Sequence, residues 1–419
     1  MHPYDQITVE SLVGKSGIKW SQGEGVIGAF IAETDFGVAE PIRAALRDLD
    51  ERDLFGYAPA WMVRELQEAT AELYAQEHGW RVPARQVAPL PDVIAGFAAF
   101  LDVFTAPGAP VILPTPAYMP FLWVPGLHER RIIEVPMRRD PEASTPWRLD
   151  PADLETAFAA ADAELAAAAA AAAASGDAAS RSAAGEGPRH RGPVLILCNP
   201  HNPTGKVHTR EEMAQIARVV QAHDGWVFSD EIHAPVVYSG ARHVPYASTG
   251  AAAAGHTVTA TAASKAFNIP GLRCAQLLFS DEADAARWAE RGEFVSKSAS
   301  NPGMLATTAA YREARVWARE TRDYLEGNRD ELGDLLTQHL PGVGWIPPQA
   351  TFLAWLDVSA LGIPGCPQEF FLERAAVSLT DGAQCGQGLG GHVRLNFGMP
   401  RPVLREAVER MGRAAAQLA

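Results

Sequence analysis

The stretch "VLILCNPHNPTG", residues 194–205, joins an uninterrupted apolar run to a group of turn-forming residues. Val194–Cys198 has the length of one strand, and a strand that is apolar at every position is typical of a parallel sheet covered on both faces. The asparagines, prolines and glycine that follow are turn residues. The stretch therefore predicts an inner strand that leads into a polar turn.

Further short strands are predicted later in the chain, at "GWVFS" (225–229), "TVTAT" (257–261) and "CAQLLFS" (274–280). A helical pattern covers Glu211–His223 between the first strands, and another places apolar residues at helical spacing over Trp61–Tyr74. Strands that alternate with helices at such spacings indicate a parallel sheet with right-handed crossovers. We therefore expect an α/β fold.

The chain of 419 residues is too long for one ordinary core. Strands predicted at "TFLAWLD" (351–357) and "HVRLNFG" (392–398), with a helix over Val403–Leu418, lack the strand–helix alternation and indicate a separate α+β unit. We expect three parts: an N-terminal segment over residues 1–40 that packs with the small domain, a large domain over 41–295, and a small C-terminal domain over 296–419.

An alanine-rich segment, residues 157–190, interrupts the large domain. Ala166–Ala174 are nine consecutive alanines, and serine, glycine, aspartate, arginine and proline follow them. Alanine favours helix but brings little apolar area to a core. We expect a helical extension that runs into a flexible surface insert.

Composition excludes several classes of partner. The net charge of −14 argues against a nucleic-acid surface or an anionic membrane. No run of 18 or more apolar residues has bulky side chains throughout, and "MHPYDQITVE" at the start does not resemble a secretory signal. Scattered cysteines without a CxxC pair predict free thiols in a reducing cytoplasm, and no metal site. The cysteines are Cys198, Cys274, Cys366 and Cys385.

Three strand ends carry chemically active side chains: Asn202 in "HNPTG", Asp230 in "SDEIH" and Lys265 in "SKAFNIPGLR". In an open parallel sheet, ligands bind outside the carboxyl ends of the strands, so these residues are expected to share one crevice. A carboxylate that emerges from a buried strand is costly unless a positive group meets it. Lysine forms Schiff bases, and an acid can keep a ring nitrogen protonated. The set indicates a carbonyl-type cofactor.

The order of these motifs resembles the fold-type I pyridoxal-phosphate enzymes of aminotransferase class I/II. Within them it is most similar to the cystathionine β-lyase group of MalY/PatB type. The resemblance covers nearly the whole chain apart from the alanine-rich segment. It implies pyridoxal 5′-phosphate (PLP) as cofactor, a large PLP-binding domain with a mostly parallel sheet, a smaller α+β domain, and a homodimer.

The resemblance also implies catalytic and binding roles. Lys265 matches the Schiff-base lysine, which also moves the proton between Cα and C4′, and Asp230 matches the residue that pairs with the pyridinium nitrogen. Asn202 matches the residue that binds the phenolic oxygen of the cofactor. Arg394, in "HVRLNFG", matches the arginine that holds the substrate carboxylate. A guanidinium binds a carboxylate through two parallel hydrogen bonds.

Further cofactor contacts follow from the same resemblance. Arg273 matches the phosphate-binding arginine, Tyr118 in "TPAYMPF" the aromatic that stacks on the ring, and Tyr57 in "FGYAPA" a tyrosine that reaches the phosphate of a neighbouring subunit. His233 stands three residues after the aspartate, where many aminotransferases have tyrosine. It either hydrogen-bonds the phenolic oxygen or an adjacent side chain, or is a supporting histidine without a role in proton transfer.

Some positions depart from the pattern. Asp92 occupies the place of a glycine in the phosphate turn, where it either repels the phosphate or caps the next helix, so Val93 and Ile94 are the expected amide donors. Ala262 replaces a phosphate-binding serine, and we expect Ser264, rather than Thr261, to supply the hydroxyl. In "AFIAETDF", Glu33 and Thr34 are expected to alter the wall near the substrate side chain.

Three functions are compatible with these residues. The first is a C–S β-lyase that converts cystathionine, cysteine conjugates or related amino acids to a thiol, pyruvate and ammonia. The second is an aminotransferase, which needs the same lysine, aspartate and arginine and passes the amino group to a 2-oxo acid. The third is a non-catalytic regulatory or binding protein that keeps the fold. The chain has no helix-turn-helix pattern or basic arm to favour the third.

Overall fold

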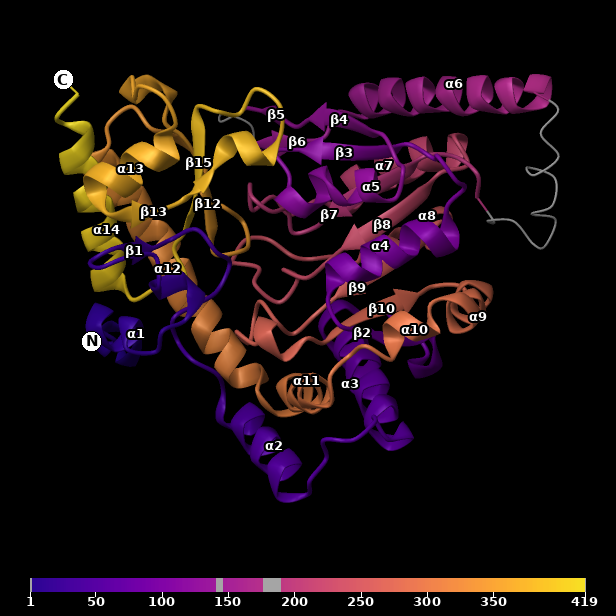
Figure 1. Ribbon diagram of the computed structural model, residues 1–419, viewed down its shortest axis with the longest axis horizontal. Coiled ribbons are helices and arrows are strands. Elements are labelled where there is room, and N and C mark those ends of the chain that lie inside the picture. Colours follow the sequence, from indigo (N-terminus) through magenta and orange to yellow (C-terminus); the bar gives the residue numbers. More distant parts are fainter. Residues whose placement is uncertain (1, 141–145, 176–189, 419) are drawn as a thin grey trace.

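A computed structural model describes residues 2–140, 146–175 and 190–418 (Figure 1). Its centre is a seven-stranded sheet in the order β2-β10-β9-β8-β7-β3-β4. β10 runs antiparallel to both of its neighbours, and the other neighbouring strands are parallel to each other. The predicted α/β fold with a mostly parallel sheet is confirmed. The strands are β2 (Val87–Leu90), β3 (Val111–Thr115), β4 (Ile132–Pro136), β7 (Val194–Cys198), β8 (Trp226–Asp230), β9 (Thr257–Thr261) and β10 (Ala275–Phe279).

Apolar cores lie on both faces of this sheet, which explains the uninterrupted apolar run in β7. Val194 and Ile196 pack on one face with aromatic residues of α4, whereas Leu195 and Leu197 pack on the other with residues of α6 and α7. The helices of the sheet region are α2 (Glu40–Glu51), α3 (Ala60–His78), α4 (Val93–Phe104), α5 (Val124–Leu127), α6 (Pro151–Ser175), α7 (Arg210–Ala222), α8 (Ala251–Gly255), α9 (Glu282–Arg291), α10 (Glu293–Ser296) and α11 (Asn301–Glu313).

A four-stranded antiparallel sheet in the order β11-β12-β15-β14 lies beside the large sheet (Figure 1). Its apolar residues share a core with the long helix α12 and with α13 and α14. These elements are β11 (Gly344–Trp345), β12 (Leu353–Asp357), β14 (Thr380–Asp381), β15 (His392–Asn396), α12 (Arg315–His339), α13 (Pro367–Ala375) and α14 (Arg401–Ala415).

The N-terminal segment contains α1 (Val9–Val13) and β1 (Ile27–Gly28), and β1 pairs in parallel with β13 (Val377–Ser378) near the small sheet. α11 packs against α2 and α3, and its Tyr311 donates a hydrogen bond to Gln276 of β10 at 3.0 Å. The division into segments 1–40, 41–295 and 296–419 stays a proposal. A short antiparallel pair of β5 (Arg138–Arg139) and β6 (Trp147–Arg148) completes the strands that the structure describes.

Residues 157–175 of the alanine-rich segment belong to α6, and the nine alanines lie in the second half of this helix. Leu154, Phe158 and Ala161 of the first half are buried against the large sheet and α7, whereas residues 166–174 are exposed. By length and composition alone α6 is apolar enough to cross a membrane, with a mean hydropathy of 1.4. The predicted helical extension is confirmed, and residues 176–189 of the predicted insert lie outside the described residues.

Candidate active site

A cavity of about 750 Å³ opens at the carboxyl ends of the parallel strands, between the large sheet and the small sheet. This volume is in the range of small-molecule and cofactor sites. Elements from both sheets and from the N-terminal segment contribute to its walls. It is lined by all the predicted site residues except Tyr57, namely Val93, Ile94, Tyr118, Asn202, Asp230, His233, Ser264, Lys265, Arg273 and Arg394.

Lys265 lies in the turn after β9, and its Nζ donates a hydrogen bond to the carbonyl of Ala32 at 3.0 Å. Burial disfavours the charged amine, and the positive charge of Arg394 adds to this effect, so the pKa of Lys265 falls to about 8. The carboxylates of Glu33 and Asp230 act in the opposite direction. About one tenth of the amine is therefore neutral and nucleophilic at pH 7, far more than for an ordinary lysine.

Asp230 is the last residue of β8 and is buried. Its Oδ1 accepts a hydrogen bond from the backbone N–H of Ile232 at 3.1 Å, and the thiol of Cys198 donates to Oδ2 at 3.8 Å. Burial raises the pKa of Asp230 to about 6, against the lowering effects of these two bonds and of the charge on Lys265. A cationic partner brought against this carboxylate would favour its ionised form.

Arg394, on β15, is buried and hydrogen-bonded on both terminal nitrogens. Its Nη1 donates to Oδ1 of Asn202 at 3.1 Å, and its Nη2 donates to the carbonyl of Phe30 at 2.9 Å and to Oγ1 of Thr380 at 3.1 Å. Burial lowers the pKa of this guanidinium from its ordinary value. These contacts fix the guanidinium in the cavity wall, where it provides a positive charge for a carboxylate.

His233 lines the same cavity, and neither of its ring nitrogens has a hydrogen-bond partner within the described chain. Burial, with the nearby charges of Lys265 and Arg394, lowers the pKa of His233 to about 3, so the ring is neutral. Buried polar groups are normally hydrogen-bonded, so unpaired nitrogens in a cavity wall are available to a bound ligand or to water.

The N-terminus of α4 forms another part of the wall. Asp92 caps this helix, because its Oδ1 accepts a hydrogen bond from the N–H of Ala95 at 2.7 Å. The capping role expected for Asp92 is confirmed. Its other oxygen, Oδ2, lies 2.8 Å from Nη2 of Arg273, and Val93 and Ile94 line the cavity beside it.

Ser264 lines the cavity together with Ala262, and its role as the phosphate-binding hydroxyl stays a prediction. Thr261 is buried, and its side chain hydrogen-bonds the phenol of Tyr74 instead. Glu33 lines the cavity as expected. The expectation for Thr34 is wrong, because this residue does not line the cavity and its backbone is bound to Asn268.

The two predicted tyrosines differ in position. Tyr118 lines the cavity and lies edge-on to Phe121, with ring centroids 5.8 Å apart. Tyr57 lies between α2 and α3, is fully exposed, and does not line the cavity of its own chain. Its proposed position across a subunit interface stays a prediction.

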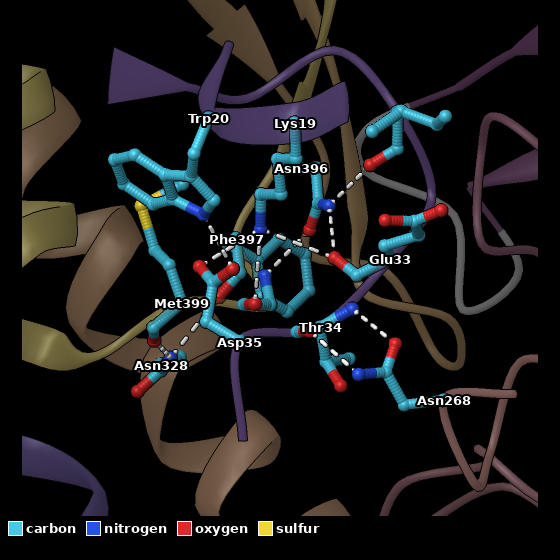
Figure 2. Close-up of polar contacts among 12 residues, drawn as sticks. Lys19, Trp20, Glu33, Thr34, Asp35, Asn268, Asn328, Asn396, Phe397 and Met399 are labelled. Atoms are coloured by element: carbon cyan, nitrogen blue, oxygen red, sulfur yellow. Dashed lines mark hydrogen bonds and ion pairs between the residues drawn. The ribbon is translucent and has the colours of Figure 1, made fainter. Parts of the chain in front are cut away.

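The sequence did not predict a buried polar cluster around Lys19 and Asp35 (Figure 2). The cluster adjoins residues 30–33, which line the cavity. Nζ of Lys19 lies 2.9 Å from Oδ2 of Asp35 and also donates to the carbonyls of Glu33 and Gly398. The indole N–H of Trp20 donates to Oδ1 of Asp35 at 2.8 Å. Lysine is rarely buried without a partner, but nothing in the local sequence around Lys19 identifies that partner.

Two asparagines extend this cluster around residues 30–35, as Figure 2 shows. The side chain of Asn396 donates to the carbonyls of Ile31 and Glu33, and the side chain of Asn268 binds both the N–H and the carbonyl of Thr34. The carbonyls that accept from Lys265 and Arg394 belong to this same segment. The cluster therefore positions the backbone that holds two of the predicted site residues.

The aminotransferase class I and II family matches residues 29–411. The chain belongs to this family. It is 32% identical to the cystathionine beta-lyase of Corynebacterium glutamicum over 96% of this chain and 98% of that protein. It is 29% identical to the cystathionine beta-lyase PatB of Bacillus subtilis over 96% and 97% of the two chains.

Solved structures agree with this family assignment. A PLP-dependent beta-cystathionase from Corynebacterium diphtheriae superposes with a TM-score of 0.85 at 34% identity, and the match covers 98% of both chains. The resemblance to fold-type I PLP enzymes of MalY/PatB type is confirmed. Members of this family use PLP.

The cavity fits this cofactor. Asp230 is a buried carboxylate without a cationic hydrogen-bond partner among the described residues, and a protonated ring nitrogen would supply one. Lys265 presents a buried amine for an aldehyde, and the α4 N-terminus with Arg273 presents N–H groups and charge for a phosphate. His233 has nitrogens available for a polar ring substituent.

Proposed function

We propose that this protein is a PLP-dependent C–S β-lyase that cleaves sulfur amino acids to a thiol, pyruvate and ammonia. One observation carries the cofactor chemistry of this proposal: Lys265, Asp230 and Arg394 come from three separate elements and line one cavity. Similarity to cystathionine β-lyases over nearly the full chain supports the substrate class.

When bound, PLP supplies an aldehyde that captures the substrate amine and a cationic ring that withdraws electrons from Cα. Asp230 holds the ring nitrogen in its charged form, because a buried carboxylate favours an adjacent cation. Asn202 accepts a hydrogen bond from Arg394 through Oδ1, so its Nδ2 is left to donate to the phenolic oxygen. His233 and Tyr118 line the same wall. His233 would support that contact, and Tyr118 would stack on the ring.

Lys265 removes the proton from Cα of the substrate. An amine with a pKa of about 8 accepts a proton readily at neutral pH and can also release it. Arg394 binds the substrate carboxylate and thereby orients the Cα–H bond toward the lysine. The leaving group is a thiolate, which needs no strong acid, because the pKa of a thiol is only about 8.5.

The phosphate of the cofactor is assigned to the N–H groups of Val93 and Ile94, the hydroxyl of Ser264, and Arg273. We also propose a homodimer in which Tyr57 reaches the phosphate of the partner subunit. Tyr57 is fully exposed in the single chain, so its ring is accessible to a partner subunit. A cytoplasmic location is proposed from the four cysteines, which are all free.

The proposed function is tested by incubating purified PLP-loaded protein with L-cystathionine and no added 2-oxo acid. Release of pyruvate, ammonia and free thiol in equal amounts is expected. Strict dependence on a 2-oxo acid acceptor, without pyruvate release, would establish the aminotransferase alternative instead. Absence of any visible cofactor absorbance in the purified protein would favour a non-catalytic role.

A further inference from the structure

The phosphate end of the cavity contains an anion of its own. Oδ2 of Asp92 lies 2.8 Å from Nη2 of Arg273, and Oδ1 of the same carboxylate accepts the hydrogen bond from the N–H of Ala95. Asp92 therefore binds the guanidinium that an incoming phosphate needs at this place, and it holds its own negative charge at the first turn of α4, beside Val93 and Ile94. The side chains of Asp92 and Arg273 are 35% and 60% exposed, so the pair is open to solvent on one side.

Backbone geometry does not require aspartate at this position. The φ angle of Asp92 is −164° and its ψ angle is 169°, an extended conformation that any residue adopts. Its side chain is held instead by the cap and by the ion pair. A neutral capping residue, such as asparagine or serine, would keep the bond to Ala95 and remove only the charge.

We propose that Asp92 weakens the binding of the phosphate group of PLP by competing with that phosphate for Arg273 and by placing a negative charge at the α4 N-terminus. The inference rests on the proposed function, which assigns the phosphate to this end of the cavity. It adds that the cofactor binds less tightly, and exchanges more readily, than the same cavity would allow with a neutral residue at position 92.

The physical argument holds for either position of the carboxylate. If Asp92 keeps Arg273, the phosphate loses a cationic partner. If Asp92 releases Arg273, two anions lie within a few ångströms of each other at the helix N-terminus, and their repulsion opposes binding. Because both side chains are partly exposed, water and salt reduce the effect to about tenfold in affinity.

The test measures the dissociation constants of PLP and of pyridoxal, which lacks the phosphate, for the full-length protein by equilibrium dialysis. The variants are Asp92→Asn and Asp92→Ser, each of which keeps a helix cap. The matched control is Asp281→Asn, because Asp281 caps α9 through the N–H of Ala283 at 2.7 Å and does not line the cavity.

We expect both Asp92 variants to bind PLP about tenfold more tightly than the wild type, with pyridoxal affinity unchanged and no effect in the Asp281 control. Equal or weaker PLP binding in both variants would overturn the inference. An equal gain for PLP and pyridoxal would also overturn it, because the effect would not involve the phosphate. A wild-type protein that binds no PLP at all would instead refute the proposed function, and this inference with it.

Discussion

Nη1 of Arg394 donates a hydrogen bond to Oδ1 of Asn202 across 3.1 Å, although the two residues are 192 positions apart in the chain. Arg394 belongs to the small sheet, and Asn202 follows a central strand of the large sheet. The bond joins the proposed carboxylate-binding group to the proposed cofactor-binding amide. One direct contact between the two sheets thus links the proposed substrate site to the proposed cofactor site.

Replacement of Arg394 by glutamine is expected to lower kcat/KM for cystathionine about 100-fold, since a hydrogen bond to a charged group contributes about 1.5–3 kcal/mol. The change should lie mainly in KM, with cofactor absorbance retained. Steady-state kinetics measure it. Arg405→Gln is the control, because Arg405 forms an exposed ion pair with Glu331 away from the cavity. An unaltered KM in Arg394→Gln would contradict the assigned role.

Replacement of Lys265 by alanine should remove the covalent link to the cofactor. After borohydride reduction, mass spectrometry is expected to find the cofactor mass on the wild type and not on the variant. Turnover should fall by about 10²–10⁴-fold or more, because a positioned acid–base group usually contributes a factor of this size. Lys297→Ala, which removes an exposed partner of Glu293, should keep both properties. A Lys265→Ala variant that carries the cofactor mass after reduction and remains active would contradict the assignment.

The rate at which cofactor-stripped protein combines with PLP should depend on pH through Lys265. The amine attacks an aldehyde only when neutral, and the pKa of Lys265 is lowered to about 8 by burial. The rate is therefore expected to rise with pH and to level off above about 8. An ordinary lysine would show its midpoint near 10.4. Stopped-flow absorbance across this range decides between the two values, and a midpoint near the ordinary value would contradict the buried environment.

The free energy of unfolding should depend on pH through the titration of Asp230. Burial raises the pKa of Asp230 to about 6, so between about pH 4 and 6 the folded chain holds a proton that the unfolded chain releases. The stabilisation is complete below about pH 4 and is lost as the pH rises through 6. Relative to Asp230→Asn, cofactor-stripped wild type should therefore lose up to about 3 kcal/mol in the free energy of unfolding across this window. Urea unfolding at several pH values measures it, and parallel curves for the two proteins would contradict the raised pKa.

Replacement of Lys19 by methionine should destabilise the protein by about 3–5 kcal/mol, because it leaves the buried carboxylate of Asp35 without its cation. Arg47→Met is the control, since Arg47 pairs with Glu40 on the surface, where such pairs contribute about 0–1 kcal/mol. Chemical denaturation gives both values. A Lys19 variant as stable as this control would show that the cluster does not hold the N-terminal segment in place.

Much of the fold follows from local patterns. The strand at Val194–Cys198 has the bounds that its apolar run predicts, and the helices around Trp61–Tyr74 and Glu211–His223 occur where their spacing places them. The spacing of apolar residues indicates which positions of an element are buried. These elements were predictable because each of them has such buried positions. Of the two residues expected in the cavity wall, Glu33 lines the cavity and Thr34 does not. Side-chain direction follows no fixed period in an irregular segment, so the sequence does not show which of two adjacent residues faces the cavity.

By itself the sequence determined the α/β class, the family, and the residue types that the chemistry needs, because these depend on short motifs and on local hydrophobic pattern. Only the tertiary structure decided that Lys19 pairs with Asp35, that Arg394 contacts Asn202, and that Asp92 engages Arg273. The last two contacts join segments that are distant along the chain, and the first joins residues 16 positions apart within an irregular part of the N-terminal segment. Their partners are selected by the shared geometry of packed elements, and no local pattern of residues encodes that geometry.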